Sequence, residues 1–248
     1  MCVIIYVSET GKVSEDRLRE AYKANPDGCG VLWAKNERLI CHKGNYSFED
    51  FLVFYKRAMS PLIVHFRTAS SGAISNDAAH PLFVNDNLAF AENGNLFEYS
   101  DGESGLTDVQ RFNELFLKKL PQNFLYRSDT HQALEAYCVN RMVKMVFMDN
   151  LGKVRIINES AGEWVDGCWF SNGGIPGYIG YGFSGAYPLK ENEIRHFGGL
   201  QSVMTFDEKE RKLWSQCKTC LGWFPNKEIQ KSACVGCREW KKLVEFTK

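Results

Sequence analysis

The sequence has no long apolar run and no excess of charge of one sign. No stretch of about 18 or more apolar residues occurs, so we expect no membrane-spanning helix and no membrane partner. The 30 Lys and Arg side chains balance 30 Asp and Glu, so the charge of the whole chain selects no partner class. The first residues, MCVIIYVSETGK, lack the basic start and apolar core of a secretory signal peptide.

The composition is that of a folded protein with many cysteines. Hydrophobic residues make up 44% and aromatic residues 13% of the 248 residues, which is ample for a packed core. This length fits one large domain or a large domain with a small appendage. Nine cysteines without a secretion signal indicate reduced thiols that serve a metal or catalysis, and not disulfides. We therefore expect a cytoplasmic protein.

Apolar periodicity predicts strands, then helices, then strands again. The predicted strands are residues 3–7, 28–34, 38–42, 62–68, 88–91, 142–148, 154–157 and 164–171. The predicted helices are residues 14–24, 48–59, 107–120 and 128–139. This order indicates two antiparallel sheets with helical layers outside. Residues 173–204 form a predicted linker or extension, since their Gly- and aromatic-rich start lacks the lysine and the strand-to-helix setting of a phosphate loop.

The second residue is a cysteine whose backbone amine would become free on removal of Met1. An α-amine titrates near about pH 8, so it can accept the thiol proton, directly or through water. Cys2 would then supply both a thiolate nucleophile and its base. Taken alone, the position is better explained by a small buried residue at the start of a strand.

Four further segments follow Cys2 in order along the chain. They are NPDGCG at residues 25–30, HFRTASSG at 65–72 with AHPLF at 79–83, ENGNL at 92–96, and TDV at 107–109. Together with Cys2 they resemble the class II glutamine amidotransferases, which are N-terminal-nucleophile hydrolases, over roughly residues 1–172. The resemblance implies an α+β fold, a four-layer αββα sandwich over residues 2–172. It also implies hydrolysis of the glutamine side-chain amide through a thioester at Cys2.

The resemblance also implies roles for the matched residues. Beside the nucleophile Cys2, Asn93 and Gly94 would form an oxyanion hole, although Asn-Gly is also a common hairpin turn. Arg67 would bind the substrate carboxylate with two parallel hydrogen bonds, although it could equally be a sheet-edge arginine in a salt bridge. Thr68 and His80 complete the candidate substrate-binding residues, while His65 and His80 are interpreted first as structural.

Two departures from the family pattern accompany these matches. Glu92 stands where many members carry His, and it puts a negative charge near the oxyanion site. Val3 stands where well-known members often have Gly. Neither residue replaces an atom that the mechanism requires.

The substrate ammonium group would need an acidic partner, and two residues compete for this role. Asp108 begins the first helix after the Asn-Gly turn, whereas Asp129 lies in a literal Ser-Asp-Thr at the start of the next helix. We favour Asp108 because the second helix leads directly into the strand predicted at 142–148. Either residue could instead be an ordinary first-turn acid.

The C-terminal residues 205–248 contain two Cys-x-x-Cys pairs, with residues 221–233 between them. The four thiols predict one structural zinc ion with all four positions filled, a closed site that leaves no catalytic position. The predicted ligands are Cys217, Cys220, Cys234 and Cys237. Ten basic and four acidic residues from position 209 onward are compatible with nucleic acid, but we favour contact with a protein or with the chain's own domain.

The predicted function leaves the ammonia acceptor open. Residues 173–248 are too few for a synthetase domain, so ammonia would pass to a separate synthetase subunit, or the protein would be a free-standing amidase on glutamine or a related small amide. A catalytically inactive scaffold, whose zinc tail binds a protein or nucleic acid, is the alternative. A third possibility is an amide hydrolase for a substrate other than glutamine.

Overall fold

The computed structural model describes residues 2–69, 75–100 and 104–172, and the backbone of four short strands between residues 214 and 234. The chain divides into two compact units. The first contains Met1–Leu120 and Val143–Phe183, and the second contains Pro121–Met142 and Ser184–Lys248. The candidate site lies in the first unit.

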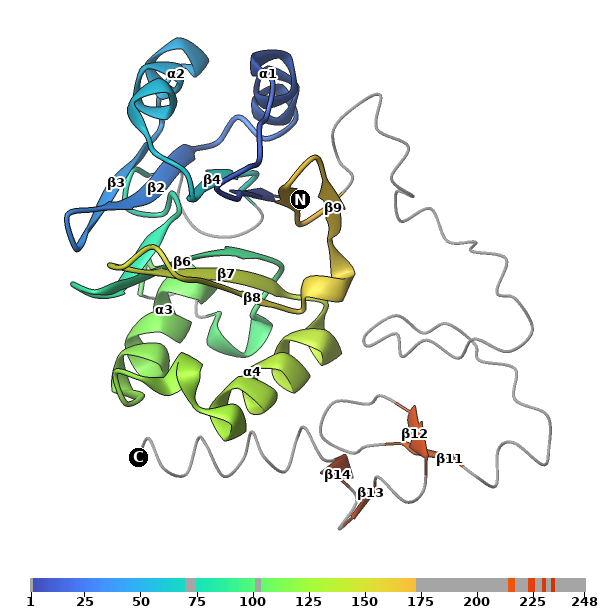
Figure 1. Ribbon diagram of the computed structural model, residues 1–248. Helices are drawn as coiled ribbons and strands as arrows, with labels where there is room; N and C mark the ends of the chain where they lie inside the picture. Colours follow the sequence, from blue (N-terminus) through green and yellow to red (C-terminus); the bar gives the residue numbers. More distant parts are fainter. Residues whose placement is uncertain are drawn as a thin grey trace. The chain divides into compact units, whose positions relative to one another are not determined.

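The first unit contains a six-stranded antiparallel sheet with the order β3-β2-β4-β1-β10-β9 (Figure 1). Its strands are β1 (Val3–Val7), β2 (Cys29–Lys35), β3 (Arg38–Gly44), β4 (Leu62–Phe66), β9 (Glu163–Val165) and β10 (Cys168–Phe170). β1 therefore lies between β4 and β10, and its N-terminal end carries Cys2. β-Branched and aromatic residues make up all of β1 and most of β4, as expected for strands in the middle of a sheet.

A second, four-stranded antiparallel sheet has the order β5-β6-β7-β8. Its strands are β5 (Leu82–Asn85), β6 (Leu88–Asn93), β7 (Lys144–Asp149) and β8 (Val154–Ile157). The two sheets pack face to face through a shared apolar cluster. This cluster consists of Ile4, Leu32, Ile63, Ala89, Ala91, Val146, Met148 and Trp169.

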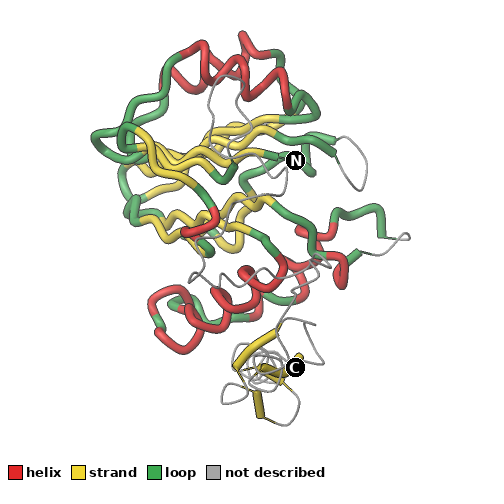
Figure 2. The backbone as a smooth tube through the Cα atoms, turned by 90° about the vertical axis from the view of Figure 1, so that its right-hand side faces the viewer, coloured by secondary structure: helices red, strands yellow, loops and turns green. Residues whose placement is uncertain are grey.

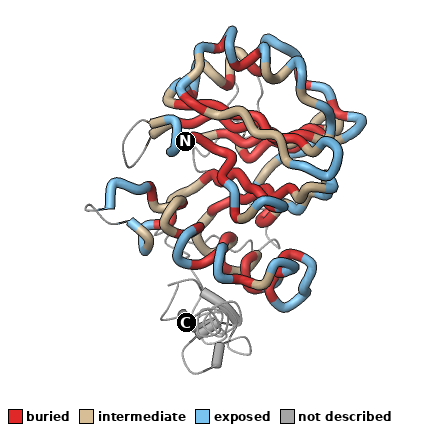
Figure 3. Tube along the Cα trace, turned by 90° about the vertical axis from the view of Figure 1, so that its left-hand side faces the viewer, coloured by how far each residue is buried: buried red, intermediate tan, exposed pale blue. Residues whose placement is uncertain are grey.

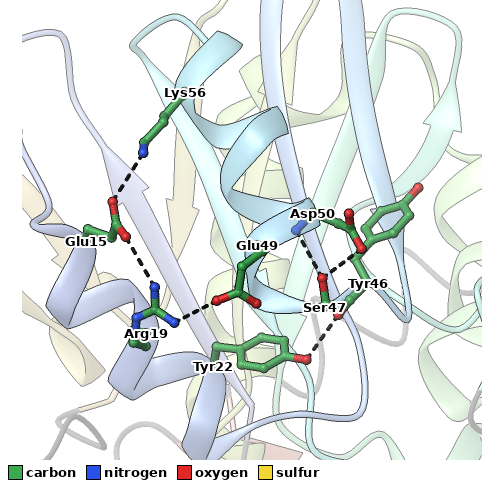
Figure 4. Close-up of polar contacts among 8 residues, drawn as sticks. All are labelled: Glu15, Arg19, Tyr22, Tyr46, Ser47, Glu49, Asp50 and Lys56. Atoms are coloured by element: carbon green, nitrogen blue, oxygen red, sulfur yellow. Dashed lines mark hydrogen bonds and ion pairs between the residues drawn. The ribbon is translucent and has the colours of Figure 1, made fainter.

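Helices α1 (Glu15–Ala24) and α2 (Phe48–Arg57) cover the outer face of the six-stranded sheet (Figure 2). Each begins at a serine N-cap, Ser14 or Ser47, whose side chain accepts a backbone N–H of the first turn. Arg19 of α1 pairs with Glu49 of α2, with 2.9 Å between Nη1 and Oε1 (Figure 4). The apolar sides of both helices and the sheet beneath them are buried, whereas the outward helix surfaces are exposed (Figure 3).

Helix α3 (Asp108–Leu115) lies against the other face of the four-stranded sheet. Its start carries a capping box between Thr107 and Gln110. Asn113 donates from Nδ2 to the backbone oxygen of Phe83 at 2.8 Å, which ties the helix to β5. Helices, two sheets and α3 thus follow one another as four layers within the first unit. The predicted mixed fold with two antiparallel sheets is confirmed.

Short 3₁₀ helices and turns account for most of the differences from the sequence prediction. They are η1 (Phe97–Tyr99), η2 (Leu117–Lys119) and η4 (Glu159–Ala161). The helix predicted at 107–120 ends early, because Phe116 leaves helical geometry with φ −128° and ψ −67°. The strand predicted at 164–171 is two strands, because Asp166 and Gly167 form a turn with φ of 49° and 73°. The strand β5 was not predicted.

The second unit contains η3 (Phe124–Tyr126), α4 (Ser128–Arg141) and two short hairpins. β11 (Trp214–Gln216) pairs with β12 (Trp223–Pro225), and β13 (Ile229–Gln230) pairs with β14 (Ala233–Cys234). Cys217, Cys220 and Cys237 lie outside the described residues, and only the backbone of Cys234 is described. The zinc site therefore stays a prediction, as do the domain boundaries at 172 and 204.

The described residues contain neither a cluster of metal ligands nor a membrane-spanning helix. Among them, no group of three or more His, Cys, Asp or Glu is placed to hold a metal ion. In the same part of the chain, no helix is both long and apolar enough to cross a membrane.

Candidate active site

The Cys2 thiol lies at the N-terminal end of β1, an inner strand of the six-stranded sheet, against the segment that follows β4. The Thr68 N–H donates to Cys2 Sγ at 3.4 Å, and Sγ lies 3.5 Å from the Thr68 oxygen. Burial raises the pKa of the thiol, the Thr68 backbone lowers it, and Glu92 raises it further. The amine of Met1 and the Arg67 guanidinium lower this pKa in turn, and the pKa remains above its usual value. The thiol thus sits between cations that favour the thiolate and a carboxyl that opposes it.

A loop after α1 holds Arg67 and Thr68 in place. The Arg67 N–H donates to the Gly28 oxygen at 2.7 Å, and the Asp27 N–H donates to the Arg67 oxygen at 2.9 Å. Thr68 Oγ1 donates to Asn25 Oδ1 at 2.7 Å. The NPDG segment therefore fixes the backbone beside Cys2. Arg67 is only 5% exposed, so it is not a surface arginine, and its role as a substrate ligand stays a prediction.

Asn93 ends β6 and points between the two sheets. Its Nδ2 donates to Ser171 Oγ at 2.8 Å, and the Ile4 N–H donates to the same oxygen at 2.9 Å. The Ser171 N–H donates back to the Ile4 oxygen at 3.0 Å. Ser171 thus links the start of β1 to the end of β6. An amide nitrogen carries two hydrogens, so Asn93 can donate a second hydrogen bond.

The residue after Ser171 also contacts the nucleophile. Asn172 Nδ2 donates to the Cys2 backbone oxygen at 2.6 Å. Sequence reasoning missed both Ser171 and Asn172, because a polar pair after a predicted strand looks like the beginning of any loop. Only the pairing of β10 with β1 brings them to Cys2.

Gly94 follows Asn93 in a space too small for a side chain. A Cβ atom built there would lie 2.6 Å from Val143 Cγ2 and 2.9 Å from Glu92 Oε1. Any larger residue would displace its neighbours, so packing requires glycine at this position. The expected oxyanion pair, Asn93 and Gly94, is therefore placed at the end of β6.

Glu92 and Asp108 form an acidic pair behind the oxyanion candidates. Burial raises the pKa of Glu92 to about 8, with Asp108 raising it further and Lys144 lowering it. Asp108 Oδ2 accepts the Leu96 N–H at 2.6 Å. Asp129, the competing ammonium ligand, lies in the other unit, where it is exposed and paired with Arg127 at 3.0 Å. The preference for Asp108 over Asp129 stays a prediction.

His65 and His80 are buried between the sheets. His65 Nε2 lies 3.1 Å from the Glu92 backbone oxygen and 3.2 Å from His80 Nδ1. Burial lowers the pKa of His65 to about 3 and that of His80 well below its usual value. If His65 Nε2 carries a proton, it donates to the Glu92 backbone oxygen. His80 Nδ1 can then only be an acceptor toward His65 Nε2. This geometry supports the structural interpretation of both, and the substrate-binding role of His80 stays a prediction.

Comparison with known proteins returned structural likenesses alone. Neither a family model nor a curated protein matches the chain. The chain is similar to glutamine phosphoribosylpyrophosphate amidotransferase from B. subtilis, solved with ADP and GMP, at 15% identity and a TM-score of 0.41. The match covers 68% of this chain and 41% of that one.

Two further solved structures are similar. A glutamine aminotransferase class-II domain protein from Silicibacter pomeroyi matches at 17% identity and a TM-score of 0.37, over 60% of this chain and 73% of that one. The allosteric regulatory enzyme of purine biosynthesis matches at 15% identity and a TM-score of 0.40, over 68% of this chain and 40% of that one. This chain thus spans less than half the length of two of these three proteins.

Proposed function

We propose that this protein is a class II glutamine amidotransferase-type amide hydrolase with Cys2 as its nucleophile. One observation carries the proposal. Cys2 and the buried Arg67 flank neighbouring strands of one sheet, since Cys2 directly precedes β1 and Arg67 directly follows β4. Asn93 ends β6 of the other sheet and is linked to β1 through Ser171, which supports a shared site. A buried arginine beside a thiol fits an anionic, amino-acid-like substrate.

The reaction begins once Met1 is removed and Cys2 has a free amine. The amine takes the thiol proton, and the thiolate attacks the side-chain amide carbon of glutamine. Asn93 Nδ2 and the Gly94 N–H stabilise the oxyanion, each donor being worth about a hundredfold to a thousandfold in rate. The C–N bond breaks as the Cys2 ammonium protonates the leaving nitrogen, which departs as ammonia. Water then cleaves the thioester and releases glutamate.

Substrate binding follows from the charges around the thiol. Arg67 binds the α-carboxylate, with Thr68 and His80 as further candidates, and Asp108 receives the α-ammonium group. The ammonia goes to a separate synthetase subunit or into solution. We further propose a cytoplasmic location and a structural zinc ion held by the four tail cysteines.

The direct test is covalent labelling with a glutamine-mimicking diazo-ketone, followed by mass mapping of the adduct. We expect one adduct, on Cys2, in protein whose intact mass lacks Met1. Arg67→Ala should lower glutamine kcat/KM by more than about a hundredfold and slow the labelling, because carboxylate recognition is lost. Arg19→Ala is the matched control and should keep full activity, because Arg19 contacts only residues of α1 and α2. These contacts are its ion pairs with Glu49 and Glu15 and its stacking over the Phe48 ring. An adduct on any other cysteine would overturn the site.

One observation favours the alternative, a catalytically inactive scaffold. Burial and Glu92 both raise the pKa of the Cys2 thiol, which opposes thiolate formation. A scaffold would retain Met1, release no glutamate from glutamine and not react with the diazo-ketone. A processed N-terminus without glutamate release would instead indicate an amide other than glutamine.

A further inference from the structure

Glu92 is a buried carboxyl that the proposed reaction does not use. It is 5% exposed and lies on β6, directly before the oxyanion pair. Its neighbours Ala91 and Asn93 face the six-stranded sheet, so alternation along the strand directs Glu92 toward α3. Among the described residues, no donor hydrogen-bonds to its Oε1. A carboxylate in such a place would lack the partners that a buried charge needs.

The charged groups around Glu92 come from every element packed against it. Asp108 approaches from α3, Lys144 from β7 and the Cys2 thiol from the start of β1. His65 of β4 meets only its backbone oxygen and is neutral. Lys144 is itself buried, and burial lowers its pKa. No ion pair within 4 Å joins Lys144 to Glu92 in the part of the chain that the structure describes, so the carboxyl has no close compensating cation.

The position of Oε1 matters because of what lies beside it. A Cβ built on Gly94 would be 2.9 Å from this oxygen, so Oε1 adjoins the backbone that is proposed to hold the oxyanion. The charge of Glu92 also raises the pKa of the Cys2 thiol through space. Both the thiolate and the oxyanion are negative, and a carboxylate at short range in a buried site opposes both.

We propose that Glu92 is a positioning residue that supports the reaction as a neutral carboxylic acid and suppresses it when ionised. This inference rests on the proposed function. The neutral acid fills the space between Gly94 and α3 without adding charge beside the thiolate. Release of its proton to solvent places a negative charge next to two groups that must themselves become negative.

The electrostatic environment agrees with this inference. The pKa of Glu92 is raised to about 8, so the carboxyl is mostly neutral at pH 7 and ionises above pH 8. The suppression is therefore absent at acid and neutral pH and appears as the pH rises through about 8. A structural carboxyl without influence on Cys2 would produce no such change.

The test compares wild type with Glu92→Gln, which keeps the shape and removes the ionisation. The rate of Cys2 alkylation by chloroacetamide is measured from pH 6 to pH 10, with the adduct mapped by mass. We expect equal rates at pH 6 and about tenfold faster alkylation of the variant at pH 9, because one pKa unit of the thiol corresponds to a tenfold change in thiolate. Glutamine kcat/KM should fall above pH 8 in wild type and not in Glu92→Gln.

Asp86→Asn is the matched control, since Asp86 is an exposed carboxyl in the turn before β6, about 20 Å along the strand. Its alkylation and activity profiles should coincide with those of wild type. Coincident profiles for Glu92→Gln and wild type would overturn the inference. An equal acceleration at pH 6 and pH 9 would also overturn it, because Glu92 would then be ionised throughout.

The two proposals fail in different ways. If wild type releases no glutamate at any pH, the proposed function fails, while the alkylation profiles still report the coupling of Glu92 to Cys2. If Glu92→Gln does not fold, Glu92→Met takes its place, because it also removes the ionisation. The wild-type profile alone cannot decide, since the Cys2 amine adds its own inflection near about pH 8. A Glu92→Met profile that coincides with wild type would overturn the inference.

Discussion

At the scale of single residues, Ser171 shows how a serine without a reactive role can decide the geometry of a site. Its buried Oγ accepts hydrogen bonds from the Ile4 N–H and from Asn93 Nδ2, so it orients the proposed oxyanion donor from a strand of the other sheet. Loss of this oxygen would leave the Ile4 N–H buried without a partner. Such a group costs about 1–3 kcal/mol.

We therefore predict that Ser171→Ala lowers both stability and activity. The melting temperature should fall by several degrees, since about 1 kcal/mol corresponds to about 2–4 °C in a domain of this size. Glutamine kcat should fall about tenfold or more, because Asn93 Nδ2 is no longer held in one orientation. Calorimetry and glutamate release measure the two effects.

Ser14→Ala separates stability from catalysis in this experiment. Ser14 Oγ accepts the Arg17 N–H at the exposed start of α1, and loss of such a cap costs about 1 kcal/mol. Its kcat should be unchanged. If Ser14→Ala and Ser171→Ala lose activity equally, the role assigned to Ser171 is wrong.

At the scale of elements, the contact between β4 and the segment before β5 depends on two neutral histidines. His65 and His80 touch each other between the sheets, and burial lowers the pKa of both. Gly30 of β2 permits this approach, since a Cβ there would lie 2.1 Å from the His80 oxygen. The unfolded chain binds protons at these histidines below about pH 6.5, and the folded chain does not.

This linkage predicts acid destabilisation. Because the pKa values of both histidines are depressed in the folded state, their contribution to stability is fully present above about pH 6.5. This contribution is lost as the pH falls toward the folded-state pKa, which is about 3 for His65. Each histidine contributes a slope of up to about 1.4 kcal/mol per pH unit. His80→Asn should reduce the loss of unfolding free energy between pH 6.5 and pH 4.5 in urea titrations. An unchanged slope in His80→Asn would contradict the explanation.

Element boundaries show where sequence patterns lose information. The end of α3 at Phe116 and the turn at Asp166-Gly167 both fall inside apolar runs that look continuous in the sequence. Backbone geometry at these points follows from packing against other elements. Periodicity reports only which residues are apolar.

At the scale of the whole molecule, the tail is predicted to be a metal-dependent module. We expect about one zinc per chain by elemental analysis, lost in the double substitution Cys217→Ser and Cys220→Ser. Cys41→Ser is the matched control, because Cys41 lies on β3 of the first unit and should leave the zinc content unchanged. Full zinc content in the double variant would exclude the predicted site.

The sequence by itself determined the alternation of elements, the two antiparallel sheets and the choice of Cys2, Arg67, Asn93 and Gly94 as candidates. The elements follow from local apolar pattern, and the four candidates follow from the resemblance of ordered short motifs to a known family. A linear chain displays both. Only the tertiary structure decided that Ser171 and Asn172 join Cys2, and that Glu92 is buried without a close cation. Hydrogen-bond partners and desolvation depend on residues brought together from distant strands, and neither spacing nor composition contains that information.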